Sequence, residues 1–188
     1  MSHWLVWPML VLSLGGDNAA TSATVATAAT PLFLERCEQR EEGPVKYWRC
    51  AGLPGTDVFV QENTGRFSVS LGNDRATAES FEVPHVLGKT MEWRILGNQA
   101  QSGIVRYRFA ASQTGQAQDL LVIMKVADKA SNGCIVAIVD AAVNSAVQEL
   151  ARRTADERVP NFVCGRDKVA IAGRATDRTV SELLPSLK

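Results

Sequence analysis

Histidine and net charge are nearly missing from this chain of 188 residues. It has two histidines, and its 20 basic and 20 acidic side chains cancel at pH 7. Without a basic excess, a nucleic-acid binder that relies on neutralising phosphates is not expected. His3 lies just before the N-terminal apolar stretch, in a segment expected to be removed, which leaves His85 as the imidazole for a Ser-His or Cys-His hydrolase. Because His85 follows Pro84 in an expected loop, we interpret it as a solvated side chain.

Signatures of nucleotide binding and hydrolysis are also missing. The chain has no Gly-x-Ser-x-Gly, P-loop, Gly-x-Gly-x-x-Gly or His-Glu-x-x-His sequence. Its cysteines lack the short spacing of zinc sites. We therefore expect no cofactor, no metal and no nucleic-acid partner. Carboxylates are plentiful, but no spacing selects a glycosidase pair, so a small periplasmic hydrolase stays an alternative and catalysis is not favoured.

The composition is that of one globular domain. The chain is 46% apolar and 21% charged, which excludes gross disorder, collagen and polytopic membrane architectures. A domain of this size buries roughly 70% of the surface that its unfolded chain exposes. A sizeable hydrophobic core is therefore expected to form without help from a metal.

The N-terminus has the profile of a signal peptide. An apolar stretch runs from Trp4 to Leu14, and a tract of small residues follows it. As a helix it would rise about 16 Å, too short for a hydrocarbon core of about 30 Å. We expect cleavage after Ala23, or as late as Ala28, and a single globular domain over 24–188 with frayed ends. The protein is then periplasmic or secreted, with no membrane span after leader removal; a buried N-terminal helix is the alternative.

Four cysteines, all beyond the leader, predict two disulfides in an oxidising compartment. Proximity favours pairing Cys37 with Cys50 and Cys134 with Cys164, although four cysteines allow three pairings. In the chain-entropy model these bridges contribute about 3 and 3.7 kcal/mol. The cysteines are thus expected to be structural.

Several segments alternate apolar and polar residues, as strands with one buried face do. Pro44 to Cys50 is prone to β-structure, and a hairpin follows, with Asn63-Thr64-Gly65 at its turn. Further strands are expected around Met91 to Ile95 and Val105 to Phe109. These patterns predict an antiparallel sheet.

Two later segments, Leu120–Val126 and Cys134–Val139, are continuously apolar, so both of their faces should be buried. An amphipathic helix over Ala141–Asp156, with Asp140 as its cap, can cover the second face. We therefore predict an α+β domain of about five to seven strands, linked by disulfides, with one C-terminal helix packed on the sheet.

Arginines supply the one candidate binding surface. If Met91 and Trp93 face inward, Arg94 points the other way, and by the same parity Arg106 and Arg108 point away from Tyr107's face. Guanidinium groups bind carboxylates and phosphates bidentately. The hypothesis is an exported, non-catalytic binding protein that holds an acidic protein or a cell-envelope component. The alternative is a solvated sheet face balanced by Glu92.

Four sequences carry a resemblance to known proteins: Tyr47–Cys50 (YWRC), Glu92–Leu96 (EWRIL), Cys134–Asp140 (CIVAIVD) and the ARRTAD stretch of the expected helix. With these, the chain resembles a group of small exported proteins of alphaproteobacteria over about residues 35 to 165. The resemblance implies a periplasmic address and structural cysteines, and it implies no known reaction.

A second resemblance is to the periplasmic inhibitors of c-type lysozyme, small β-barrels with an aromatic-x-Cys-x-x-Gly start and a Ser-Gly-x-x-Tyr loop that enters the lysozyme cleft. Trp48 to Gly52 is one residue short of the first pattern, and Ser102-Gly103 to Tyr107 has one residue too many for the second. An added residue in an extended segment moves Tyr107 to the other face. Lysozyme inhibition, with Ser102, Gly103 and Tyr107 as contacts, is the alternative function.

Overall fold

The computed structural model describes residues 24–72, 79–111, 116–129 and 132–187. Within them, ten strands form two sheets beside one α-helix and several short helical turns. The strands are β1 (Val25–Pro31), β2 (Glu38–Glu42), β3 (Val45–Leu53), β4 (Thr56–Asn63), β5 (Arg66–Leu71), β6 (His85–Leu96), β7 (Gln99–Phe109), β8 (Gln118–Lys125), β9 (Cys134–Asp140) and β10 (Ala170–Ile171). The helices are α1 (Val147–Arg158), with turns at Leu34–Arg36, Val159–Asn161, Thr179–Leu183 and Leu184–Ser186.

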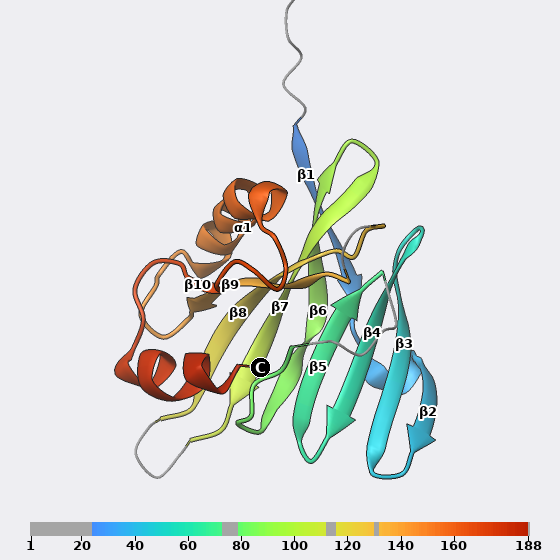
Figure 1. The fold of residues 1–188 in the computed structure, drawn as a ribbon, viewed down its shortest axis with the longest axis horizontal. Coiled ribbons are helices and arrows are strands. Elements are labelled where there is room, and N and C mark those ends of the chain that lie inside the picture. Colours follow the sequence, from blue (N-terminus) through green and yellow to red (C-terminus); the bar gives the residue numbers. More distant parts are fainter. Residues whose placement is uncertain (1–23, 73–78, 112–115, 130–131, 188) are drawn as a thin grey trace, which may run out of the picture.

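The two sheets lie side by side, with α1 on the far side of the larger one (Figure 1). The six-stranded sheet has the order β1-β6-β7-β8-β9-β10, and the four-stranded sheet has the order β2-β3-β4-β5. All pairs are antiparallel except β9 with β10. The α+β class and the C-terminal helix packed on the sheet are as the sequence predicts.

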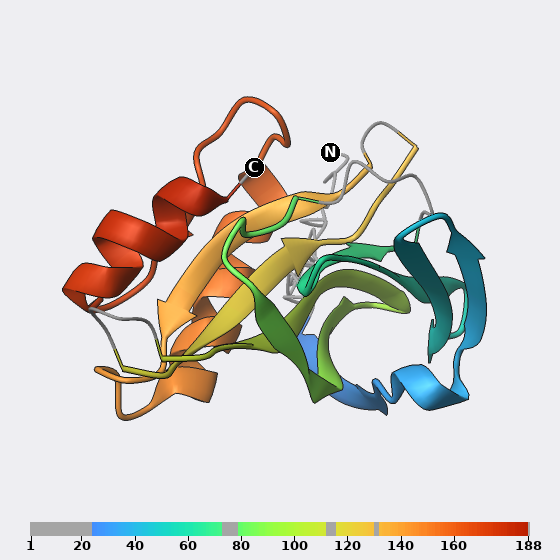
Figure 2. The ribbon, with the colours of Figure 1, turned by 90° about the horizontal axis from the view of Figure 1, so that it is seen from below.

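Two hydrophobic cores flank the larger sheet. The first lies between the two sheets, which curl toward each other in Figure 2, and it contains Trp93, Tyr107 and Ile138. The second lies between the same sheet and α1, and it contains Ile123, Val139 and Ala155. β8 and β9 contribute to both cores, which confirms that the continuously apolar segments are buried on both faces.

The hairpin β4–β5 forms where alternation predicts it. Its turn places Thr64 at a φ of 53° and Gly65 at 78°, and Asn63 pairs with Arg66 across it. Positive φ at both central residues matches the right-handed twist of the flanking strands. Val60 and Val69 consequently point into the first core, and their sequence neighbours point outward.

The helix prediction is wrong at its start. Residues 141–146 form turns, α1 begins at Val147, and no side chain caps it. Asp140 is fully buried and accepts hydrogen bonds from Ala142 N (2.9 Å) and from Thr176 N (2.8 Å). Although burial alone would raise it, these bonds and those from the hydroxyls of Thr176 and Thr179 lower the pKa of Asp140. The carboxylate therefore fastens the C-terminal segment rather than the helix.

Segments near both ends of the described chain pack against the rest of the domain. β1 lies in the small-residue tract, pairs with β6 from Val25 to Pro31, and its Thr30 Oγ1 accepts a hydrogen bond from Trp93 Nε1 (2.9 Å). At the other end, Leu183 is fully buried in the first core. Residues 1–23, with the predicted leader, lie outside the described residues.

Both disulfides join the partners that proximity favours. Cys37 binds Cys50, and Cys134 binds Cys164. The first ties the start of β2 to β3, and the second ties β9 to the segment after α1. None of the helices described is long and apolar enough to cross a membrane.

Candidate functional site

The three predicted arginines do share the sheet face opposite Tyr107, but α1 covers part of that face. Arg94 is 8% exposed. Its Nε and Nη2 bind the two carboxylate oxygens of Asp156 in α1 at 2.8 and 2.5 Å, and its Nη1 also reaches Thr27 in β1. This bidentate pair uses the guanidinium to hold α1 and β1 against β6.

Its neighbour on the same face makes the reciprocal pair. Glu92 accepts two hydrogen bonds from Arg152 of α1, at 2.8 and 2.9 Å, and one from Gln148 at 3.0 Å. Glu92 therefore pairs with the helix rather than balancing the sheet arginines. In one pair the strand supplies the base and the helix supplies the acid, and in the other pair these roles are reversed. Together the two pairs fix the position of α1 on β6.

Arg106 and Arg108 lie on the part of this face that is closer to solvent. Both contact the Asp119 carboxylate on the neighbouring strand β8, at 3.1 and 3.7 Å. The structure thus gives each of the three arginines an acidic partner within the chain, and the surface is less cationic than its sequence suggests.

The residues that resemble the lysozyme-inhibitor loop lie inside strand β7. Ser102 is 1% exposed and Tyr107 is fully buried. A Cβ on Gly103 would lie 2.6 Å from Leu71 Cδ1 and 2.7 Å from Met91 Sδ, so glycine is needed for core packing there. In this arrangement none of the three can enter the cleft of another protein.

His85 is not the solvated loop residue that the sequence suggests. It is the first residue of β6, is 4% exposed, and stacks on Tyr107 with ring centroids 4.8 Å apart. Its Nδ1 lies 2.8 Å from Val83 O, and the Phe67 backbone N–H donates to Nε2 at 3.2 Å. Burial lowers the pKa of His85, against the opposing effect of the Val83 and Phe67 carbonyls. Nε2 also lies 2.9 Å from Phe67 O, so both ring nitrogens contact backbone groups.

A cavity opens elsewhere, on the outer face of the four-stranded sheet. Its volume is about 300 Å³, at the lower end of the range of small-molecule pockets. We call it the outer-sheet cavity. The residues that line it are Glu38, Gln39, Arg40, Tyr47, Trp48, Arg49, Phe59, Val60, Gln61, Ser68 and Ser70.

The outward side chains of this cavity form two rows across the four strands. Register pairs Arg40 with Tyr47, Tyr47 with Gln61 and Gln61 with Ser68, so these four make one row. Glu38, Arg49, Phe59 and Ser70 make the next row in the same way. Each row sets a charged group, an aromatic ring and a hydroxyl side by side.

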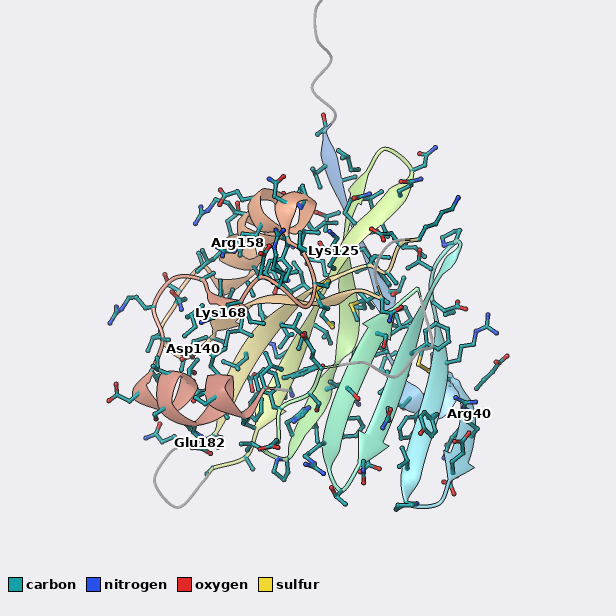
Figure 3. All side chains as sticks on the ribbon, viewed as in Figure 1. Arg40, Lys125, Asp140, Arg158, Lys168 and Glu182 are labelled. Carbon is teal, nitrogen blue, oxygen red and sulfur yellow. A yellow bond between two sulfur atoms is a disulfide. The ribbon has the colours of Figure 1, made fainter. Side chains whose placement is uncertain are left out.

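Charge in the cavity is concentrated at β2 and β3. The Arg40 guanidinium lies over the Tyr47 ring, 4.7 Å from its centroid, and contacts Glu42 at 3.6 Å (Arg40 is labelled in Figure 3). Arg49 makes closer contacts with Asp57, at 2.7 and 2.6 Å. Stacking on the ring holds Arg40 in place while leaving most of its N–H donors for another anion.

Among the described residues that line the cavity, Glu38 is the one carboxylate, whereas glycosidases use a pair. The described part of the chain also contains no group of three or more His, Cys, Asp or Glu residues placed to hold a metal ion. The arrangement of rings, hydroxyls, amides and guanidinium groups suits non-covalent binding.

Comparison with protein-family models, with curated proteins and with solved structures finds no match to this chain. Sequence reasoning missed the outer-sheet cavity. The sequence signal that could have indicated this face is the set of residues that alternate with the inward valines of the hairpin. These are Phe59 and Gln61 on one strand and Ser68 and Ser70 on the next. Their alternation shows which side chains point outward, but it does not show that this face is hollowed.

Proposed function

We propose that the protein is exported and acts in the periplasm as a non-catalytic binding protein for a cell-envelope component. The outer-sheet cavity is its binding site. The observation that supports this proposal is a cavity of about 300 Å³ with aromatic, hydroxyl, amide and guanidinium side chains in register across four strands. Concave sites with apolar surface and a few placed polar groups are the usual form of ligand sites.

Two features support the exported setting. Both disulfides are of the kind that persists in oxidising compartments. β1 begins at Val25, two residues after Ala23, the small residue that ends the shorter predicted leader. Cleavage after Ala23 leaves β1 whole, and cleavage after Ala28 removes most of its pairing with β6.

A nuclear magnetic resonance titration tests the proposal. Isotope-labelled protein is mixed with the dialysable fraction of a cell-envelope extract. We expect shifts at Gln61, Ser68 and Ser70 on the cavity face and none at the Trp93 indole, which is in the core. Tyr47→Ala should abolish the shifts by removing the ring at the cavity wall.

Arg108→Gln is the matched control, because Arg108 lies on the other sheet and away from the cavity. It should bind as the wild type does. Shifts that spread over the arginine face and are lost in Arg108→Gln, or a complete lack of shifts with folded protein, would contradict the proposed site.

A further inference from the structure

A second cavity of about 240 Å³ lies next to the outer-sheet cavity. It shares Gln61 and Ser68 with the first, so these two side chains line both spaces. Its lining residues are Gln61, Asn63, Arg66, Ser68, Ser80, Phe81 and Glu82. We call the two cavities together the outer groove.

The outer groove runs obliquely over the sheet: the first cavity reaches from β2 to β5, and the second adds Asn63 and Arg66 further along β4 and β5. Neighbouring strands are about 4.8 Å apart, so the distance from β2 to β5 is roughly 14 Å. The second cavity extends the groove beyond β5 to the segment Ser80–Glu82. A ligand that fills the groove is therefore a chain of several units and not a single small molecule.

Side chains must provide the recognition. In the middle of the groove the backbones of β4 and β5 are paired with each other from Val58–Leu71 to Asn63–Arg66. A peptide that binds by strand addition needs an unpaired sheet edge lying parallel to it. A chain that crosses paired strands cannot form those backbone hydrogen bonds.

The side chains present suit sugar rings. Tyr47 and Phe59 offer apolar ring surface, which can pack on the C–H face of a sugar. Gln61 and Ser68, at the junction of the cavities, and Asn63 beyond them offer neutral donors and acceptors for hydroxyl groups. Sugars present both kinds of surface on each unit.

At each end of the groove lies a guanidinium group that can bind an anion. Arg40 at β2 stacks on Tyr47 and has one acidic contact, Glu42, at 3.6 Å. Arg66 at β5 donates to two neutral groups, Asn63 O at 3.5 Å and Thr64 Oγ1 at 3.1 Å. Carboxylates bind guanidinium groups bidentately. Because Glu38 and Glu82 also line the groove, spaced anionic groups fit better than a dense row.

We propose that the outer groove binds a linear oligosaccharide that carries carboxylates on its sugar units. This inference rests on the proposed function and names the ligand class of the same site. Rings and neutral polar groups in the middle bind the sugar units, and Arg40 and Arg66 bind carboxylates near the two ends.

The test is calorimetric titration of the full exported protein with three probes. These are a pentamer of galacturonate, the same pentamer with its carboxyl groups reduced to alcohols, and penta-glutamate. We expect the galacturonate pentamer to bind about tenfold more tightly than the reduced pentamer, a difference of about 1.4 kcal/mol that the two guanidinium–carboxylate pairs supply together. Penta-glutamate should bind more weakly than either sugar.

Variants assign the binding to the groove. Arg40→Gln with Arg66→Gln should lower galacturonate affinity to that of the reduced pentamer and leave the latter unchanged. Tyr47→Ala should weaken both sugars. Arg108→Gln should change neither, and the circular dichroism spectrum of every variant should match the wild type.

Two results would overturn the inference: penta-glutamate binding as tightly as the galacturonate pentamer, or no sugar binding by folded protein. If the envelope extract still shifts the cavity resonances while neither sugar binds, the ligand class is wrong and the proposed function stands. If the extract also has no effect, both fail.

Discussion

At the residue scale, His85 shows how burial changes the role of a side chain. Its ring lies among Phe67, Phe81, Tyr107 and Phe109, and its two nitrogens contact backbone groups. A histidine held in this way stabilises the contact between β5 and β6 as long as it is neutral. It is a structural residue, and its charge state couples the stability of the domain to pH.

His85→Gln should change the pH dependence of stability. Because the pKa of His85 is lowered in the folded protein, the unfolded chain takes up a proton first as the pH falls below about 6.5. We therefore expect the difference in the free energy of unfolding, wild type minus His85→Gln, to decrease as the pH falls from 7.5 to 5.5. The slope is at most about 1.4 kcal/mol per pH unit.

Urea denaturation at several pH values measures this difference. The pKa of Glu79 is raised, mainly by burial, so Glu79 opposes the trend by losing stability as the pH rises above about 4.5. It is present in both proteins and largely cancels in the difference. A difference that stays constant with pH would show that His85 does not titrate differently on folding.

At the element scale, two crossed ion pairs and one terminal strand hold the layers together. α1 is attached to β6 through Arg94 with Asp156 and through Glu92 with Arg152. β1 closes the edge of the same sheet and supplies Thr27 to Arg94 and Thr30 to Trp93. These contacts link segments more than 50 residues apart in sequence.

Arg94→Gln should destabilise the domain by about 2–3 kcal/mol, because it leaves Asp156 without its bidentate partner in a largely buried position. Thermal and urea unfolding provide the measurement. Arg153→Gln, on the exposed side of α1, is the control and should stay within about 0.5 kcal/mol of the wild type. Equal effects of the two substitutions would argue against the ion pair as the attachment of α1.

Removal of residues 24–28 should weaken the edge of the larger sheet. It deletes the pairing of Val25, Ala26, Thr27 and Ala28 with β6. With several strand hydrogen bonds worth about 1 kcal/mol each, we expect a chain of 29–188 to be about 2–4 kcal/mol less stable than one of 24–188. On the proposed export, mass spectrometry of the mature protein should find Thr24 at its N-terminus. An N-terminus at Ala29 in stable, folded material would show that β1 is dispensable.

At the scale of the whole molecule, the two disulfides join different parts of the fold. Cys37–Cys50 closes a loop within the four-stranded sheet, and Cys134–Cys164 closes a longer loop that contains α1. The chain between two bridged cysteines loses conformational freedom in the unfolded state, and a longer loop loses more. The two bridges should therefore stabilise the domain unequally.

Replacing Cys134 and Cys164 by serine should lower the free energy of unfolding by about 3.7 kcal/mol, and replacing Cys37 and Cys50 by about 3 kcal/mol. Urea denaturation without reductant measures both, and reductant should have no further effect on the protein that lacks all four cysteines. A larger loss from the shorter loop would mean that native-state packing around Cys50, not chain entropy, dominates.

The sequence by itself determined the strands of the hairpin, the burial of β8 and β9 on both faces and the face on which each arginine lies, and it favoured the disulfide pairing that the structure has. All of these follow from local periodicity or short separation, which side-chain alternation encodes directly. It did not determine the start of α1, the burial of His85, or the strand β1 in a tract of small residues. Each of these depends on a partner segment far away in the chain.

The tertiary structure alone decided which polar face is available for binding. The alternation of apolar and polar residues predicts outward arginines on β6 and β7. It predicts outward aromatic and hydroxyl groups on β3 to β5 equally well. The docking of α1 covers Arg94, and Asp119 pairs with Arg106, whereas the outer face of the four-stranded sheet keeps a cavity. Whether a face is covered or open depends on how distant elements pack, and that information is not contained in the period of any single strand.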